Sequence, residues 1–231
     1  MNSSSGPRQQ IVPTNRYYWQ VWLFLLLLVG FWLKLAYLKT SIYHTDEFIS
    51  MLATKMVAQR GLPILPSGLF YDPGLLYSLI SGALVALVGF AEPIARWPVI
   101  LVSVFAIAAY YAVAHQLFGT RLAGLLAAGL ATFDIFMIKW GVWARGYSQA
   151  HLFVLLGVTW LLTSTLKRPS RRGRFLAMIF LTAALFSHTL TLFALPPLVI
   201  LLLIFTSVYR RDWLRQPGLW QEAIAGLFVF T

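Results

Sequence analysis

The sequence contains no cysteine, and only 11% of its 231 residues are charged, whereas 59% are hydrophobic. Without cysteine, the chain cannot form a disulfide, a thiolate nucleophile or a cysteine-based metal site. Soluble domains carry about 25% charged residues, so this scarcity of charge excludes an ordinary water-soluble globule. The apolar residues instead form long unbroken blocks, which are typical of a protein that crosses a membrane several times.

Several motifs of enzymes are also missing from the sequence. Its four histidines do not have zinc-ligand spacing, so we expect no metal site formed by protein ligands alone. It has no glycine-rich nucleotide-binding loop and no Gly-x-Ser-x-Gly motif, which argues against nucleotide hydrolysis. The net charge of +11 would suggest nucleic-acid binding in a soluble protein. In a membrane protein the positions of basic residues report topology instead, so we expect no nucleic-acid partner.

The hydrophobic blocks predict an all-α fold, a polytopic transmembrane helix bundle. Residues 1–16 are polar and predict a disordered cytoplasmic tail, and residues 17–231 form the transmembrane module. The blocks expected to cross the roughly 30 Å hydrocarbon core are 17–38, 98–114, 122–138, 148–166, 175–208 and 219–231. The block 175–208 is too long for one helix, and its polar break at Ser187-His188-Thr189 predicts two helices joined by a tight turn. Lys34 lies near the far end of the first block and is expected to snorkel to the membrane surface.

Residues 39–97 predict a loop on the outer face that contains surface helices. Apolar residues between Phe48 and Val57 recur at helical spacing, opposite Thr54 and Lys55, which predicts an amphipathic helix lying on the membrane. Glycine and proline after Arg60 end this helix. The apolar residues 75–90 are short for a span.

The positions of the basic residues indicate whether residues 75–90 cross the membrane. If they crossed, the five basic residues from Lys167 to Arg174 would be translocated, against the positive-inside rule. We therefore predict an interfacial or re-entrant helix at 75–90 and a cytoplasmic N-terminus. Most of the acidic residues then lie on the outer side of the membrane.

The pair Asp46-Glu47 at the start of the predicted surface helix has two interpretations. Aspartate is a favoured N-cap residue, and glutamate suits the positive end of a helix dipole. Alternatively, a carboxylate held at the membrane surface can act as a general base on an acceptor hydroxyl. Both interpretations can hold together, because a cap also fixes the direction of the carboxylate.

A second group of candidates lies at the outer end of a predicted helix pair and contains Lys139, Arg145 and Tyr147. An aromatic belt with snorkelling cations would explain it without any function. Alternatively, the planar guanidinium of Arg145 suits phosphate oxygens, so a phosphate-linked donor would fit there. His188, in the predicted turn, is either an interfacial polar residue or a group that donates hydrogen bonds and transfers protons.

Three further acidic residues have structural explanations. Asp134 lies inside a predicted helix, where we expect it to pair with Lys139 or Arg145. Asp72 can start the turn Asp72-Pro73-Gly74. Glu92 is expected to pair with Arg96.

The order of several short motifs resembles the GT-C membrane glycosyltransferases, in particular the branch of protein O-mannosyltransferases and lipid A aminoarabinose transferases. The resemblance runs from about Trp22 to Arg211 and begins with a first span, which several similar segments follow. They are Thr45-Asp46-Glu47, Asp72-Pro73-Gly74-Leu75-Leu76-Tyr77, Ala91-Glu92-Pro93-Ile94-Ala95-Arg96-Trp97-Pro98, Leu117-Phe118-Gly119-Thr120-Arg121 and Ala144-Arg145-Gly146-Tyr147. No single segment is specific, but their common order is considerably more so.

The resemblance implies transfer of a sugar from a polyprenyl-phosphate donor to an acceptor hydroxyl on the outer face, with inversion. Asp46 would be the general base and Glu47 would support it. Arg145 and Tyr147 would approach the donor, with Lys139, His188 and Asp72 as further substrate-binding candidates. No cofactor is expected, although a divalent ion, Mg²⁺ or Mn²⁺, could lie between Asp46, Glu47 and the donor phosphate.

Relatives in this branch are usually longer, so we expect this sequence to be an N-terminal half, truncated at its C-terminus. A non-catalytic subunit that packs within a larger membrane complex is the alternative to an enzyme, and possible partners are further membrane subunits. A transporter or flippase fits less well, since the charges cluster at one face. The expected location is the plasma (inner) membrane, with the active face periplasmic or extracellular.

Overall fold

The computed structural model describes residues 16–193, 196–197, 199–200 and 203–204, and these residues form helices and no β-strand. The helices are α1 (Arg16–Thr40), α2 (Thr45–Arg60), α3 (Leu75–Val88), α4 (Glu92–Phe118), α5 (Arg121–Phe133), α6 (Ile135–Trp140), α7 (Tyr147–Leu162) and α8 (Arg171–Ser187), with a π-helical turn at Thr163–Lys167. The predicted all-α fold is confirmed for this part of the chain.

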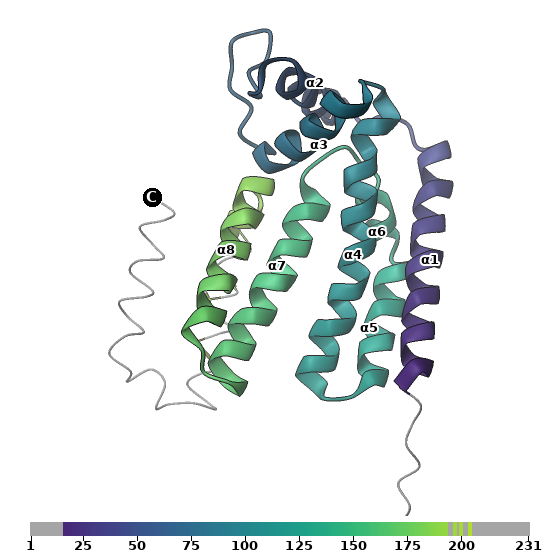
Figure 1. The fold of residues 1–231 in the computed structure, drawn as a ribbon, viewed down its shortest axis with the longest axis vertical. Coiled ribbons are helices and arrows are strands. Elements are labelled where there is room, and N and C mark those ends of the chain that lie inside the picture. Colours follow the sequence, from purple (N-terminus) through teal and green to yellow (C-terminus); the bar gives the residue numbers. More distant parts are fainter. Residues whose placement is uncertain (1–15, 194–195, 198, 201–202, 205–231) are drawn as a thin grey trace, which may run out of the picture.

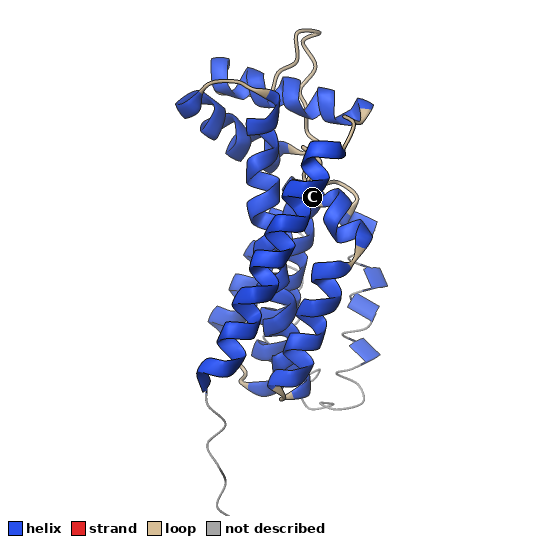
Figure 2. Ribbon diagram, turned by 90° about the vertical axis from the view of Figure 1, so that its right-hand side faces the viewer, coloured by secondary structure: helices blue, strands red, loops and turns tan. Residues whose placement is uncertain are grey.

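The long helices run side by side, and two shorter helices lie across one end of them. Figure 1 shows α1, α4, α5, α7 and α8 roughly parallel or antiparallel, with α2 and α3 at the end opposite to the start of α1. Figure 2 shows the same separation from the side. Helix α7 packs on α8 and α4, α4 packs on α5 and α1, and α2 packs on α3.

Several predicted helices are confirmed, with small changes at their ends. Helices α1 and α4 contain the predicted blocks 17–38 and 98–114, and both are long and apolar enough to cross a membrane. Helix α8 ends at Ser187, and residues 191–193 are helical again, so the predicted break is present. The predicted tail at 1–16 lies outside the described residues except for Arg16, which begins α1, and the whole of the predicted span at 219–231 lies outside them as well.

The prediction of one helix over residues 122–138 is wrong, because the chain breaks at Asp134. This residue has extended backbone angles, and its Oδ1 accepts a hydrogen bond of 2.7 Å from the N–H of Met137. Aspartate is a strong N-cap, so it ends α5 and starts α6. The predicted pairing of Asp134 with Lys139 or Arg145 is also wrong, since Arg145 binds another carboxylate.

Lys34 does not reach the membrane surface as predicted. Its side chain is only 1% exposed and lies between α1 and the segment after α6, close to Gly141. A Cβ on Gly141 would lie 2.6 Å from Cε of Lys34, so glycine leaves the room that this side chain occupies. Hydropathy along α1 could not show this burial, which depends on where α6 packs.

Helix α2 has the predicted bounds, but part of its predicted polar side is buried. It ends before Gly61, whose positive φ of 77° glycine adopts without strain. Thr54, predicted on the polar face, is buried and donates a hydrogen bond of 2.9 Å to the carbonyl of Ser50. Phe48, on the side predicted to face the membrane, is exposed. The packing of α3 on α2 decides this arrangement, since Gly82 of α3 lies against Val57 and the carbonyl of Thr54.

Candidate active site

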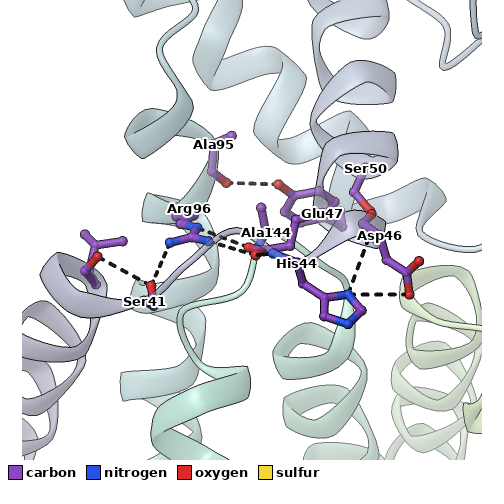
Figure 3. Close-up of polar contacts among 10 residues, drawn as sticks. Ser41, His44, Asp46, Glu47, Ser50, Ala95, Arg96 and Ala144 are labelled. Atoms are coloured by element: carbon purple, nitrogen blue, oxygen red, sulfur yellow. Dashed lines mark hydrogen bonds and ion pairs between the residues drawn. The ribbon is translucent and has the colours of Figure 1, made fainter.

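Glu47 is the centre of a buried polar cluster at the junction of α2, α4 and the segment after α6 (Figure 3). Its side chain is 0% exposed and pairs with Arg96 of α4 through two hydrogen bonds, of 3.1 Å to Oε1 and 2.7 Å to Oε2. The backbone N–H of Ala144 donates to Oε1 at 2.6 Å, and that of His44 donates to Oε2 at 2.9 Å. Such a bidentate pair fixes geometry as well as charge.

The remaining contacts of Arg96 complete this cluster. Its Nη1 donates to Ser41 at 2.9 Å, and its guanidinium lies 3.9 Å from the centre of the Tyr43 ring. The expected pairing of Arg96 with Glu92 is therefore wrong, because Arg96 points into the protein toward Glu47. The cluster joins the end of α1, the start of α2 and the start of α4.

Glu47 does not fit the role of metal ligand or reacting group. Both of its oxygens accept hydrogen bonds from protein groups, and no surface of the side chain is exposed. A cation bound there would have to replace the guanidinium of Arg96. The arrangement therefore gives no support to a divalent ion between Asp46 and Glu47, and we derive no step through one.

Asp46, the neighbouring residue, lies in a different environment. Its side chain is 49% exposed, and its Oδ2 forms an ion pair of 2.6 Å with Nη1 of Arg145. Asp46 does not cap α2 as the sequence suggested, because His44 is the N-cap residue and Glu47 completes the capping box. The carboxylate of Asp46 is thus left free to face solvent beside a cation.

The segment that carries Arg145 is held in place by buried neighbours. Ala144 is fully buried and donates to Glu47, so the same carboxylate that binds Arg96 also positions the residue before Arg145. Gly146 contacts the carbonyl of Ser187 so closely that a Cβ would overlap it. The segment is therefore fixed both to α2 and to the end of α8.

Arg145 continues into a stack of rings that ends at His188. The guanidinium lies 4.9 Å from the centre of the Tyr147 ring, and Tyr147 stacks on His188 with ring centres 4.2 Å apart. Burial, together with the positive charge of Arg145, lowers the pKa of His188 to about 4. The ring is therefore neutral near pH 7. Its Nδ1 accepts a hydrogen bond of 3.1 Å from the N–H of Leu190, which places the proton on Nε2.

A second stack lies on the other side of Asp46. The ring of His44 stacks on Trp143 with centres 4.9 Å apart, and Nζ of Lys139 lies 4.9 Å from the centre of the same indole. Lys139 lies in the last turn of α6, shortly before the segment that carries Arg145, and contacts Trp143 and not Asp46. Both cations lie over aromatic faces, a geometry in which the ring attracts the positive charge.

The structure therefore brings together most of the predicted candidates, which come from distant parts of the sequence. Asp46, Arg145, Tyr147 and His188 form one connected series of contacts. Asp72 is exposed, its carbonyl starts the predicted turn, and its side chain takes part in no ion pair within the described residues.

Sequence reasoning missed the contribution of His44. The spacing His44-x-x-Glu47 matches a capping box, but histidine stands where serine or threonine is usual, which hid the signal. The pairing of Glu47 with Arg96, 49 residues away, had no local signal at all.

Comparison with known families gives a match over most of the chain. The model of the family described as dolichyl-phosphate-mannose-protein mannosyltransferase matches residues 72–231. Arg96, Lys139, Arg145 and His188 lie within the matched residues, whereas Asp46 precedes them. No curated protein and no solved structure matches the chain.

Proposed function

The chain belongs to the dolichyl-phosphate-mannose-protein mannosyltransferase family, and on that premise we propose that it transfers a sugar from a polyprenyl-phosphate donor to an acceptor hydroxyl, with inversion at the sugar carbon. Asp46 is the general base for the acceptor. Arg145 binds the donor phosphate, and Tyr147 and His188 line the donor side of the site. Lys139 adds positive charge to the site, and Asp72 belongs to the edge of the site.

The observation that carries this proposal is the ion pair between Asp46 and Arg145. The two residues are 99 positions apart, and one is a half-exposed carboxylate while the other is a largely buried guanidinium. A sugar phosphate already has a good leaving group, so the protein needs a base for the acceptor and a cation for the departing phosphate. Both groups are present at one point, and Arg145 has further N–H donors for phosphate oxygens.

The inert environment of Glu47 supports the choice of Asp46 as the base. Glu47 is enclosed by Arg96 and two backbone N–H groups, so its role is to hold α2 and the segment before Arg145 in register. In the described part of the chain, Asp46 is the carboxylate that combines solvent access with contact to Arg145. Asp46 thus acts as the base, and the adjacent Glu47 provides structural support.

An apolar groove between α3 and α8 fits the polyprenyl chain of the donor. It is lined by leucines of α3 and by apolar residues of α8, including Leu75 and Phe186. The end of the groove at Phe186 lies next to Ser187. The carbonyl of Ser187 contacts Gly146 and lies near Gly74. A lipid in this groove would have its phosphate close to His188 and Arg145.

The positions of the basic residues support the predicted topology. Arg121 and Arg171 are the first residues of α5 and α8, and both helices begin at the end of the bundle where α1 begins (Figure 1). We place this end in the cytoplasm, following the positive-inside rule. Helices α2 and α3 then lie at the outer face of the plasma membrane with Asp46.

The substitution Asp46→Asn tests the proposal directly. We expect it to lower sugar transfer about 10²- to 10⁴-fold, the usual contribution of a general base, while the protein still folds. Transfer is measured as release of polyprenyl phosphate from radiolabelled polyprenyl-phosphate mannose in membranes that contain the protein. Asp134→Asn is the matched control, because asparagine also caps helices and Asp134 lies outside the site.

Two outcomes would contradict the proposal. Undiminished transfer by Asp46→Asn would exclude Asp46 as the base. Absence of transfer by the wild-type chain, with normal assembly of both variants into a larger membrane complex, would favour a non-catalytic subunit.

A further inference from the structure

His44 is a second titratable group beside Asp46, and the reaction proposed above does not yet use it. Its side chain is 49% exposed, as is that of Asp46, and its Nδ1 lies 3.9 Å from Oδ2 of Asp46 (Figure 3). The backbone N–H of Asp46 donates to this same Nδ1 at 3.4 Å. Nδ1 is therefore an acceptor whose lone pair meets the backbone N–H of Asp46, with the carboxylate of the same residue close by, and in the neutral ring the proton is on Nε2.

The ring of His44 is held in this orientation from two sides. Its face stacks on Trp143 at 4.9 Å with an angle of 21° between the ring planes, and its Nδ1 is fixed by the start of α2. The charged groups nearby are Asp46 and Glu47 on α2, Arg145, which contacts Asp46, and Lys139, on the ring of Trp143. An imidazole placed beside a carboxylate in this way is suited to proton transfer.

We infer that His44 takes the acceptor proton from Asp46 and passes it to water. This inference rests on the proposed function, in which Asp46 is the base. No ion pair or hydrogen bond with another described residue engages Oδ1 of Asp46, so the acceptor hydroxyl binds there. Bound substrates then separate Oδ1 from solvent, while Oδ2 still faces Arg145 and His44.

The acceptor loses its proton as the sugar is transferred to it. The acceptor oxygen forms a bond to the anomeric carbon as its proton moves to Asp46, and the bond from that carbon to the phosphate oxygen breaks with its electron pair on the phosphate. Protonated Asp46 then gives the proton to Nδ1 of His44. Rotation of the exposed carboxylate closes the gap of 3.9 Å, or one water spans it. Nε2 releases its proton to water, and exchange with water restores the starting tautomer.

The variant His44→Asn separates this role from helix capping. Asparagine is at least as good an N-cap, so α2 is expected to form normally, and thermal unfolding in detergent verifies this. We expect initial transfer from radiolabelled polyprenyl-phosphate mannose, in membranes containing the full chain, to fall about tenfold. Added imidazole is expected to raise the rate of His44→Asn in proportion to its concentration. It should not change the rate of the wild type or of Asp46→Asn.

The outcomes distinguish this inference from the proposed function. A rate for His44→Asn equal to that of the wild type would overturn the relay and leave Asp46 as the base. A reduced rate that does not change with imidazole would limit His44 to a structural role, such as its stack on Trp143, which also overturns the relay. Failure of the proposed function would instead appear as full activity of Asp46→Asn or as no transfer by the wild type.

Discussion

Glu47→Gln tests whether the buried pair with Arg96 holds the active site together. The side chains of Glu47 and Arg96 are 0% and 1% exposed, so loss of the carboxylate charge leaves a guanidinium in the interior without a counter-charge. Breaking such a buried pair costs about 3–5 kcal/mol of folding free energy. Glutamine retains one acceptor oxygen, so the N–H groups of His44 and Ala144 compete for it.

The free energy of unfolding is measured by titration of the purified protein from mild detergent into sodium dodecyl sulfate. Asp46→Asn is the matched control, because its pair with Arg145 is half exposed and such pairs contribute about 0–1 kcal/mol. The two adjacent substitutions should therefore have opposite profiles. Glu47→Gln should lose stability, and Asp46→Asn should lose sugar transfer.

A third variant shows whether the loss comes from the uncompensated charge. Combining Glu47→Gln with Arg96→Met removes both charges, so the double variant should be more stable than the sum of the two single losses predicts. The reasoning would be refuted if Glu47→Gln unfolded within about 1 kcal/mol of the wild type. It would also be refuted if the two substitutions were additive.

Three more predictions concern the surroundings of the site, and the same unfolding titration measures each of them. Gly146→Ala should destabilise the protein, because its Cβ would overlap the carbonyl of Ser187; Gly129→Ala, with open space around it, should stabilise its helix by up to about 1 kcal/mol. Lys34→Met should raise stability, because Nζ of Lys34 is buried and has no hydrogen-bond partner among the described residues; a loss of stability would reveal a partner. Stability should fall as the pH is lowered from about 6.5 toward 4, because the pKa of His188 is about 4 in the folded protein and the unfolded chain takes up that proton first. His188→Gln should reduce this dependence, and an unchanged dependence would contradict the assignment.

Composition and periodicity determined the class of the protein and most helix positions. Long apolar blocks can be satisfied only as helices in a membrane, so α1, α4, α7 and α8 were predictable from their residues alone. The break after Ser187 was predictable as well, because a polar run interrupts an apolar block. The break at Asp134 was missed. A single acid within an apolar run is equally typical of an ion-pair partner and of a helix cap.

The sequence by itself also identified Asp46, Glu47, Arg145, Tyr147 and His188 as candidates, because their side-chain chemistry suits a base and a phosphate site and their motifs resemble those of the GT-C glycosyltransferases. Only the tertiary structure distinguished their environments. Asp46 and Glu47 are adjacent in sequence, but consecutive side chains point about 100° apart around a helix axis. One therefore faces solvent and the other faces Arg96. Burial and pairing depend on the packing of α4 and of the segment before α7 against α2, which are contacts between distant residues that no local pattern encodes.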